Sequence, residues 1–275
     1  MSSHTSITSD TLARFVGSGH APVIVDVRSE DDFTADPLLI PGSIRRDASD
    51  VETRGSAFPN RLVVVSCGDG RARSQGVSAW LRREGIQALS LDGGFQAWRT
   101  GGHLLTRAAA IPSRDTSGRT IWVTRERPKI DRIACPWLIR RFVDPEAIFL
   151  FVEASEVPSV AERFKGTPFD IEGVFWSHRG DTCTFDTMLT EFGLKSEALD
   201  RLAAIVRGAD TARLELAPQA AGFLAASLGL SRLFDDDLAQ LDAGMTLYDA
   251  MYLWCRDASG ETHNWPSKKP QSGRE

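Results

Sequence analysis

The strongest signal for chemistry in this sequence is Cys67 together with the residues that follow it. Cys67 comes directly after a short apolar run, residues 61–66, and precedes a stretch with helical periodicity that starts near residue 74. The loop between them contains two glycines, which let the backbone curl so that successive N–H groups converge on one point. The next helix adds the positive end of its dipole, and Arg71 and Arg73 add full charges, so a thiolate is favoured over a thiol.

The same loop is suited to binding an oxyanion such as thiosulfate, sulfate or phosphate. We expect Cys67 to be the catalytic nucleophile. The substrate-binding residues expected around it are Gly68, Asp69, Gly70, Arg71, Ala72 and Arg73. A lone cysteine before a helix is usually an inert core residue, but two glycines and two arginines in the next six positions favour a reactive site.

A second group of charged residues could bind an anion. Four basic residues lie within eight positions, close to a predicted junction of strand and helix: Arg125, Arg127, Lys129 and Arg132. Of these, Arg125, Lys129 and Arg132 form the second anion site that we expect, for a divalent oxyanion. The alternatives are a solvated basic face paired with nearby acidic residues, and phosphate contacts on DNA. The net charge of -5 and the lack of a helix-turn-helix pattern disfavour DNA.

Four potential metal ligands lie within nine positions further along the chain: His178, Asp181, Cys183 and Asp186. Imidazole, thiolate and carboxylate groups suit zinc or a transition metal, and we expect His178 and Cys183 to be the ligands. The spacing matches no familiar metal site, so hydrogen-bonded core residues are the alternative. Apart from this metal, no cofactor is expected.

Size and composition limit the class of protein. A length of 275 residues corresponds to roughly two domains, and 42% hydrophobic with 25% charged residues is typical of a soluble globular chain. No apolar run approaches the roughly 20 residues of a membrane helix, and the N-terminus lacks a signal-peptide pattern, so no membrane partner is expected. The four cysteines are scattered without a C-x-x-C pair, which indicates free thiols in a reducing, cytoplasmic location.

The elements that must position Cys67 alternate between strand and helix patterns. Short apolar runs predict strands at 22–27, 61–66 and 88–91, and helical spacing predicts a helix over 74–84. Alternation of this kind indicates an α/β domain over residues 1–105, with an open parallel sheet covered by helices.

The remainder of the chain has a different pattern. Segment 106–119 is poor in large apolar residues and is expected to be a linker, and the polar segment 258–275 is expected to be a flexible tail. Between them, residues 120–257 are expected to form a mainly helical α+β domain. Strands are predicted at 120–123 and 147–152. Helices are predicted at 130–142, 185–192, 197–208, 218–228 and 236–256.

Several motifs in the first domain resemble the rhodanese family in order and spacing. They are Asp26-Val27-Arg28, Asp32-Phe33, Ile40-Pro41-Gly42-Ser43-Ile44, the Cys67 loop, and the run from Leu91 to Trp98. The resemblance implies that Cys67 takes a sulfur atom from a thiosulfate-type donor, holds it as a persulfide and passes it to a thiophilic acceptor. It also implies that Asp26 and Arg28 support the fold and do no chemistry.

The loop departs from most sulfurtransferases of that family in its length. If Arg73-Ser74 aligns with the family's Arg-Ser, the pattern is Cys67-x5-Arg73, one residue longer than usual. That length resembles rhodanese-fold phosphatases and arsenate reductases, although Ser66 stands where those phosphatases tend to have histidine. A phosphatase or oxyanion reductase is therefore an alternative.

The second domain resembles the C-terminal domain of ChrB-type chromate-resistance proteins. The resemblance rests on the run from Trp122 to Phe142, on Phe169-Asp170-Ile171, Ser177-His178, Cys183-Thr184-Phe185-Asp186, on the runs 205–210 and 216–222, and on Tyr248-Asp249-Ala250. It implies a role in chromate tolerance, with a small sulfur compound or oxyanion as ligand. The favoured reading joins sulfur transfer at Cys67 to oxyanion detoxification. The competing reading is a chromate-responsive regulator without turnover.

Overall fold

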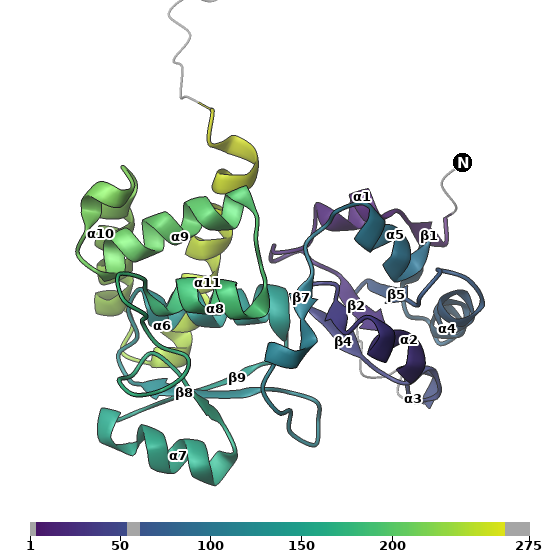
Figure 1. Ribbon diagram of the computed structural model, residues 1–275, viewed down its shortest axis with the longest axis horizontal. Coiled ribbons are helices and arrows are strands. Elements are labelled where there is room, and N and C mark those ends of the chain that lie inside the picture. The colour runs from purple at the N-terminus through teal and green to yellow at the C-terminus, as the bar shows by residue number, and fades with distance from the viewer. Residues whose placement is uncertain (1–3, 54–60, 262–275) are drawn as a thin grey trace, which may run out of the picture.

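The computed structural model describes residues 4–53 and 61–261, and in this range the first domain is built on a five-stranded parallel sheet (Figure 1). The strand order is β1-β6-β5-β2-β4, and every neighbouring pair is parallel. The strands are β1 (Ser6–Ile7), β2 (Val23–Asp26), β4 (Ser43–Arg45), β5 (Val63–Ser66) and β6 (Ala88–Leu91). The expected α/β class is confirmed, and β5, which leads into Cys67, is the central strand.

Helices cover both faces of this sheet, as the strand sequences require. The helices are α1 (Ser9–Ala13), α2 (Glu30–Ala35), α3 (Ala48–Thr53), α4 (Ala72–Arg83) and α5 (Gly94–Thr100). Val63 and Val65 of β5 pack with Leu81 of α4 on one face, whereas Val64 packs with Trp98 of α5 on the other. All residues of β5 are buried, as expected for a central strand in a covered parallel sheet.

A second, smaller parallel sheet opens the second domain, with the strand order β10-β8-β9. Its strands are β8 (Ile121–Arg125), β9 (Ile148–Val152) and β10 (Thr167–Pro168). The helices packed around it are α6 (Asp131–Leu138), α7 (Val157–Phe164), α8 (Thr184–Phe192), α9 (Glu197–Asp210), α10 (Ala220–Leu233) and α11 (Asp237–Leu253). Helix α6 continues as a π-helical turn (Ile139–Val143), and α11 ends in a second one (Trp254–Ala258). This domain is mainly helical, as predicted.

The segment expected to be a linker is folded against both domains. Its first strand, β7 (Thr106–Arg107), pairs antiparallel with β3 (Leu38–Leu39), and a 3-10 turn (Ala108–Ala110) follows. The Thr106 hydroxyl is buried and donates to the Phe142 carbonyl oxygen at 2.9 Å. The tail expected over 258–275 lies outside the described residues from 262 onward.

The two domains share one hydrophobic core. Val16 and Trp98 of the first domain belong to the same buried cluster as Phe142 and Tyr252 of the second. Gly17, at φ +79, lies so close to them that a Cβ atom there would be 2.4 Å from Phe142 and 2.7 Å from Tyr252. The domains therefore meet through packed side chains and are not separate bodies on a flexible connection.

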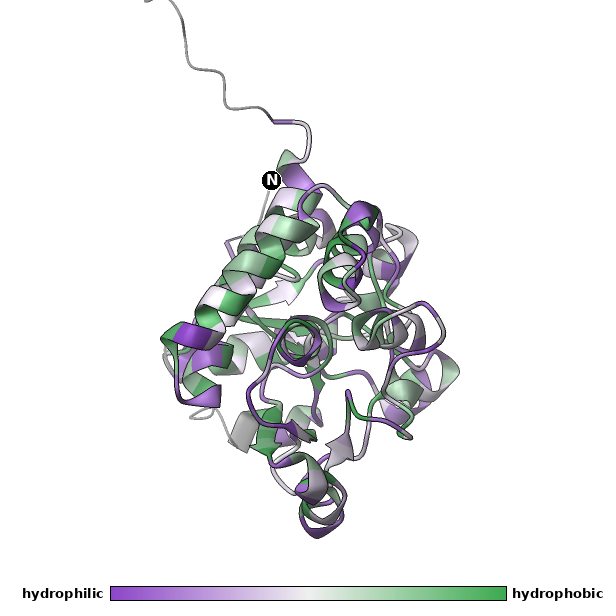
Figure 2. Ribbon diagram, turned by 90° about the vertical axis from the view of Figure 1, so that its left-hand side faces the viewer, coloured by the Kyte–Doolittle hydropathy of each residue, from purple (hydrophilic) through white to green (hydrophobic). Residues whose placement is uncertain are grey.

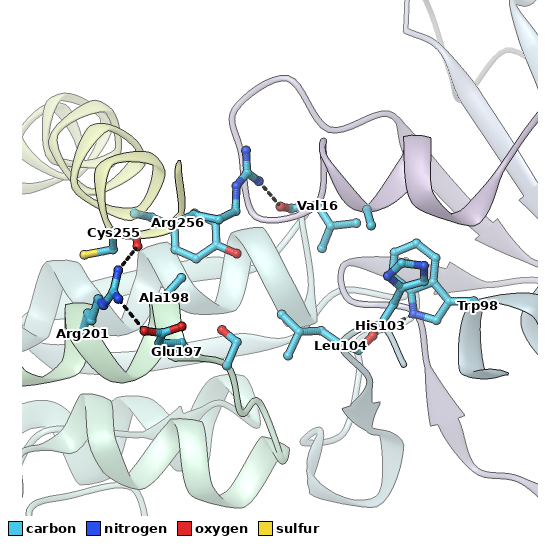
Figure 3. A pocket seen from close by; sticks show the side chains of 12 residues that line it. Val16, Trp98, His103, Leu104, Glu197, Ala198, Arg201, Cys255 and Arg256 are labelled. Atoms are coloured by element: carbon cyan, nitrogen blue, oxygen red, sulfur yellow. Dashed lines mark hydrogen bonds and ion pairs between the residues drawn. The ribbon is translucent and has the colours of Figure 1, made fainter. Parts of the chain in front are cut away.

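A cavity of about 320 Å³ lies along this shared interface, and Figure 3 shows its lining. Trp98 and Leu104 approach from the first domain, and Arg201 and Cys255 from the second. At its edge the Arg256 guanidinium donates to the carbonyl oxygen of Val16 at 3.5 Å (Figure 3).

Hydrophobic and hydrophilic residues are interleaved along the helices of the second domain (Figure 2). Within the part of the chain that the structure describes, no helix combines the length and apolar character needed to cross a membrane.

Candidate functional site

Cys67 lies at the carboxyl end of the central strand β5, where parallel sheets generally bind their ligands. Its side chain is buried, with 3% of the residue surface exposed. The Sγ atom lies 3.2 Å from the Ser74 Oγ atom and 3.5 Å from the Asp69 Oδ1 atom. One hydroxyl and one carboxylate thus lie beside the sulfur, while the residue itself packs in the apolar cluster between the sheet and α4.

Two glycines hold the loop in shape by allowing it to touch the turn before α5. Gly70 (φ +71) and Gly94 (φ +59) both have left-handed backbone angles, and their backbones are in contact. A Cβ atom at Gly94 would lie 2.3 Å from the Cys67 carbonyl oxygen and 2.4 Å from the Gly70 nitrogen. That carbonyl oxygen also accepts a hydrogen bond from the Phe95 amide at 2.8 Å. The run from Leu91 to Trp98 therefore supports the Cys67 loop directly.

The charged residues of the loop differ in what they do. The carboxylate of Asp69 accepts a hydrogen bond from the Arg71 amide at 3.1 Å, and so occupies one donor expected to bind an anion. This bond is the main reason that the pKa of Asp69 is lowered. The Arg71 side chain is 82% exposed, and the Arg73 guanidinium donates to the Val27 carbonyl oxygen at 3.3 Å. An incoming anion would compete with Asp69 for the loop amides.

Asp26 and Arg28 form a buried ion pair beneath the loop. The Arg28 Nη2 atom lies 2.7 Å from the Asp26 Oδ2 atom. The side chain of Arg28 is 1% exposed and that of Asp26 is 4% exposed. Arg28 also donates to the Leu38 carbonyl oxygen and lies 3.8 Å over the Phe95 ring. These contacts fit the supporting role that the resemblance implies.

Two of the three basic residues predicted as a second anion site are in contact, because the Arg132 Nη1 atom donates to the Arg125 carbonyl oxygen at 3.3 Å. Arg125 ends strand β8 and lines a cleft of about 740 Å³. Arg132 turns inward: its Nη1 atom donates to the Glu126 carbonyl oxygen at 2.8 Å, and its Nε atom lies 3.3 Å from Asp170. Lys129 is exposed. Of the three, only Arg125 lines that cleft.

The cleft is formed by the carboxyl ends of the small parallel sheet, the same kind of edge that holds Cys67 in the large one. Arg125 contributes from the end of β8, Ser155 from the segment after β9, and Asp170 from the segment after β10. His178 lines the same cleft from the loop before α8.

His178 lies at the centre of a group of carboxylates. Its Nε2 atom is 3.5 Å from Asp131 Oδ2, 3.4 Å from Asp170 Oδ1 and 3.3 Å from Asp210 Oδ2. Thr184 ties two of them together, because its amide donates to Asp131 at 2.5 Å and its hydroxyl to Asp170 at 2.8 Å. We call Asp131, Asp170, His178 and Asp210 the acid–histidine cluster.

Burial and mutual repulsion shift the titration of this cluster. Desolvation, followed by the charges of Asp210 and Asp170, raises the pKa of Asp131 well above its usual range. Desolvation and the Asp170 charge raise the pKa of Asp210 as well. A hydrogen bond to Asp170, followed by the charges of the other carboxylates, raises the pKa of His178 to about 9.

The backbone around the cluster is strained. Ile130, directly before Asp131, has φ +29, and Asp170 has φ +51, both unusual for residues with a side chain. The Tyr248 hydroxyl donates to the Ile130 carbonyl oxygen at 2.8 Å and helps to hold that turn. Strained positions of this kind concentrate at functional sites.

The second predicted metal ligand, Cys183, is next to this cluster but has another role. Its Sγ atom lies 3.3 Å from the Asp186 Oδ2 atom, and its amide donates to the same oxygen at 3.0 Å, so the pair caps helix α8. The thiol also neighbours Asp131. Burial raises the pKa of the Cys183 thiol.

Sequence reasoning found His178 but missed the three carboxylates around it. Asp181, which the sequence spacing groups with His178, is exposed. Asp170 and Asp210 stand apart from Asp131 in the sequence and come together only because β10 adds beside β8 and because α9 ends over the cluster. Of the three carboxylates, Asp170 alone closely follows a strand, whereas Asp131 begins helix α6 and Asp210 ends helix α9.

Comparisons with known protein families match the two domains of the chain separately. The family model of the rhodanese-like domain matches residues 8–100, and the model of the ChrB C-terminal domain matches residues 122–255. The first domain is therefore rhodanese-like in sequence and in fold. Two separate parts of the chain thus match two different family models, the rhodanese-like domain and the ChrB C-terminal domain.

Individual relatives cover only parts of the chain. It is 37% identical over 149 residues to Protein ChrB of Cupriavidus metallidurans, which is 53% of this chain and 44% of that protein. The chain thus spans less than half the length of this curated relative. A rhodanese-related protein of Thermoplasma volcanium is 22% identical over 37% of this chain and 96% of its own, with a TM-score of 0.33. A rhodanese-like domain protein of Staphylococcus aureus is 28% identical over 34% of this chain and 90% of its own length, with a TM-score of 0.31.

Proposed function

We propose that this protein acts in chromate tolerance as a sulfurtransferase whose sulfur carrier is Cys67. The observation that carries the proposal is the position of Cys67 at the end of the central strand, in a loop held by Gly70 and Gly94 with a hydroxyl and a carboxylate beside the sulfur. A reducing, cytoplasmic location fits this role because all four cysteines are free.

The other cysteines are poor candidates for the carrier. Desolvation raises the pKa of Cys135 well above the usual thiol range and raises that of Cys183. Desolvation also raises the pKa of Cys255, to about 11. At neutral pH these thiols stay protonated and are weak nucleophiles.

The reaction proceeds in two balanced steps. The Cys67 thiolate attacks the outer sulfur of thiosulfate, a new S–S bond forms, the S–S bond of thiosulfate breaks, and sulfite leaves with the bonding electrons. An acceptor such as cyanide then attacks the outer sulfur of the persulfide. This step releases thiocyanate and restores the Cys67 thiolate. Both steps use the thiolate as nucleophile or leaving group and need no metal.

A phosphatase or an oxyanion reductase on the same loop is less favoured. Either reaction would rely on Arg73 to bind a tetrahedral anion, and its guanidinium donates to the Val27 carbonyl oxygen.

The test follows thiocyanate formation from thiosulfate and cyanide, together with intact mass, for the wild type and Cys67→Ser. The matched control is Cys255→Ala, which removes a buried thiol in the second domain. We expect turnover and the added mass of one sulfur atom in the wild type and the control, and neither in Cys67→Ser. A wild-type protein without adduct or turnover would contradict the persulfide mechanism.

A further inference from the structure

One carboxylate oxygen buried in the second domain has no hydrogen-bond partner in the part of the chain that the structure describes. Asp131 is fully buried, and its Oδ1 atom accepts no hydrogen bond from the described residues, while the Cys183 thiol lies beside the same carboxylate. An ionised carboxylate in this position is strongly disfavoured unless another group compensates its charge. The other oxygen of the same carboxylate faces His178 at 3.5 Å.

The charges around Asp131 are unbalanced toward the negative. Three carboxylates surround one imidazole, and Arg132 is the guanidinium in direct contact with one of them, Asp170.

The geometry is that of a metal site with one open side. One ligand atom each from Asp131, Asp170 and His178 can be chosen so that all lie within 4.8 Å of one another, and Asp210 approaches the same imidazole nitrogen at 3.3 Å. The His178 side chain is 42% exposed, and with Asp170 it lines the cleft at the sheet edge. An ion bound here would keep a face toward solvent.

We propose that Asp131, Asp170, His178 and Asp210 bind one divalent first-row metal ion at the floor of this cleft. Carboxylate oxygens and one imidazole suit Mn²⁺, Fe²⁺ or Zn²⁺. The ion compensates the buried charge of Asp131. The site is separate from Cys67, so sulfur transfer neither requires nor tests it.

The experiment uses the full chain, stripped with a chelator and titrated with Mn²⁺. Electron paramagnetic resonance measures the free ion, and elemental analysis gives the bound metal per chain. A parallel titration with Zn²⁺ is followed by calorimetry. We expect one ion per chain in the wild type.

Two variants assign the ligands. His178→Ala removes a half-exposed side chain and Asp210→Asn removes one charge, and each should weaken binding by more than about tenfold, the lower end of the loss seen for residues that only support a metal ligand. His20→Ala is the matched control, because His20 is an exposed histidine in the first domain.

Each outcome decides the proposal. It is supported if the wild type and His20→Ala bind one ion with equal affinity while both ligand variants lose it. Circular dichroism of the variants separates a lost ligand from a lost fold. The proposal is overturned if neither ion binds to the wild type at millimolar concentration, or if folded His178→Ala and Asp210→Asn bind as the wild type does.

Discussion

The Sγ atom of Cys67 lies 3.5 Å from the carboxylate of Asp69, two residues further along the same loop. The Asp69 oxygen nearest the sulfur is also the one that accepts the Arg71 amide. The loop therefore carries its own anion in the place where a substrate anion is expected. Because Asp69 is 54% exposed, its side chain can leave without disturbing the core.

Removing the Asp69 charge should make Cys67 more reactive. We expect Asp69→Asn to be alkylated by iodoacetamide roughly threefold to tenfold faster than the wild type, because a nearby like charge disfavours the thiolate. The rate is measured by intact mass over time at neutral pH. Asp31→Asn, an exposed change on α2, should leave the rate unchanged. A slower reaction of Asp69→Asn would instead assign Asp69 the role of proton acceptor.

Gly94 should be intolerant of a side chain. Gly94→Ala places a Cβ atom against Cys67 and Gly70 and strains a left-handed backbone, so we expect a loss of about 1–3 kcal/mol in the free energy of unfolding. Thiocyanate formation should fall with it, because the loop must move. Gly76→Ala is the control: it lies in helix α4 with open space around it and should stabilise by about 0.5–1 kcal/mol. Equal urea midpoints for the two variants would contradict this.

The ion pair of Asp26 and Arg28 should matter for stability and not for chemistry. Asp26→Ala leaves the Arg28 charge buried and unpaired, and we expect a loss of about 3–5 kcal/mol on urea unfolding. Glu84→Ala breaks an exposed pair with Arg83 and should cost at most about 1 kcal/mol. A small effect of Asp26→Ala would mean that water reaches Arg28.

His178 should titrate unusually high in the chelator-treated protein. Its imidazole faces Asp131, Asp170 and Asp210, with Arg132 behind Asp170, and the pKa of His178 is raised to about 9. The protonated ring thus contributes its full stabilisation below about 6.5, the ordinary histidine value, and this contribution is lost as the pH rises through about 9.

Nuclear magnetic resonance of the ring protons checks this titration, with His178→Gln to assign the signal. Asp170→Asn should shift the midpoint to lower pH, because the hydrogen bond to Asp170 is the largest cause of the raised pKa. A midpoint near that of a free histidine would show that the carboxylates do not face the ring in solution.

The sequence predicted the first domain better than the second for a physical reason. The strands β2 and β5 are short, wholly buried runs of valine and isoleucine, so their pattern is visible without any partner. Weaker elements were not foreseen: β1 and β10 are two residues each, and β10 contains Pro168. Elements this short have no periodicity to read.

The same limit explains the site in the second domain. The Cys67 loop is local, so glycine and arginine spacing predicts it from a single stretch of chain. The acid–histidine cluster is assembled from four separate segments, and Asp170 reaches it only through the pairing of β10 with β8. Local spacing instead favoured Cys183, whose thiol contributes to the cap of α8.

The shared core has a consequence for how this chain responds to heat. The packing of Gly17 against Phe142 and Tyr252, and of Val16 and Trp98 into the same cluster, couples the melting of one half to that of the other. A calorimetric scan should then record a single endotherm whose van't Hoff and calorimetric enthalpies agree. If residues 1–105 were produced alone, the apolar side chains of Val16 and Trp98 would lose their contacts with the second domain and be exposed to water. The rhodanese-like half is thus, in thermodynamic terms, only part of a cooperative unit.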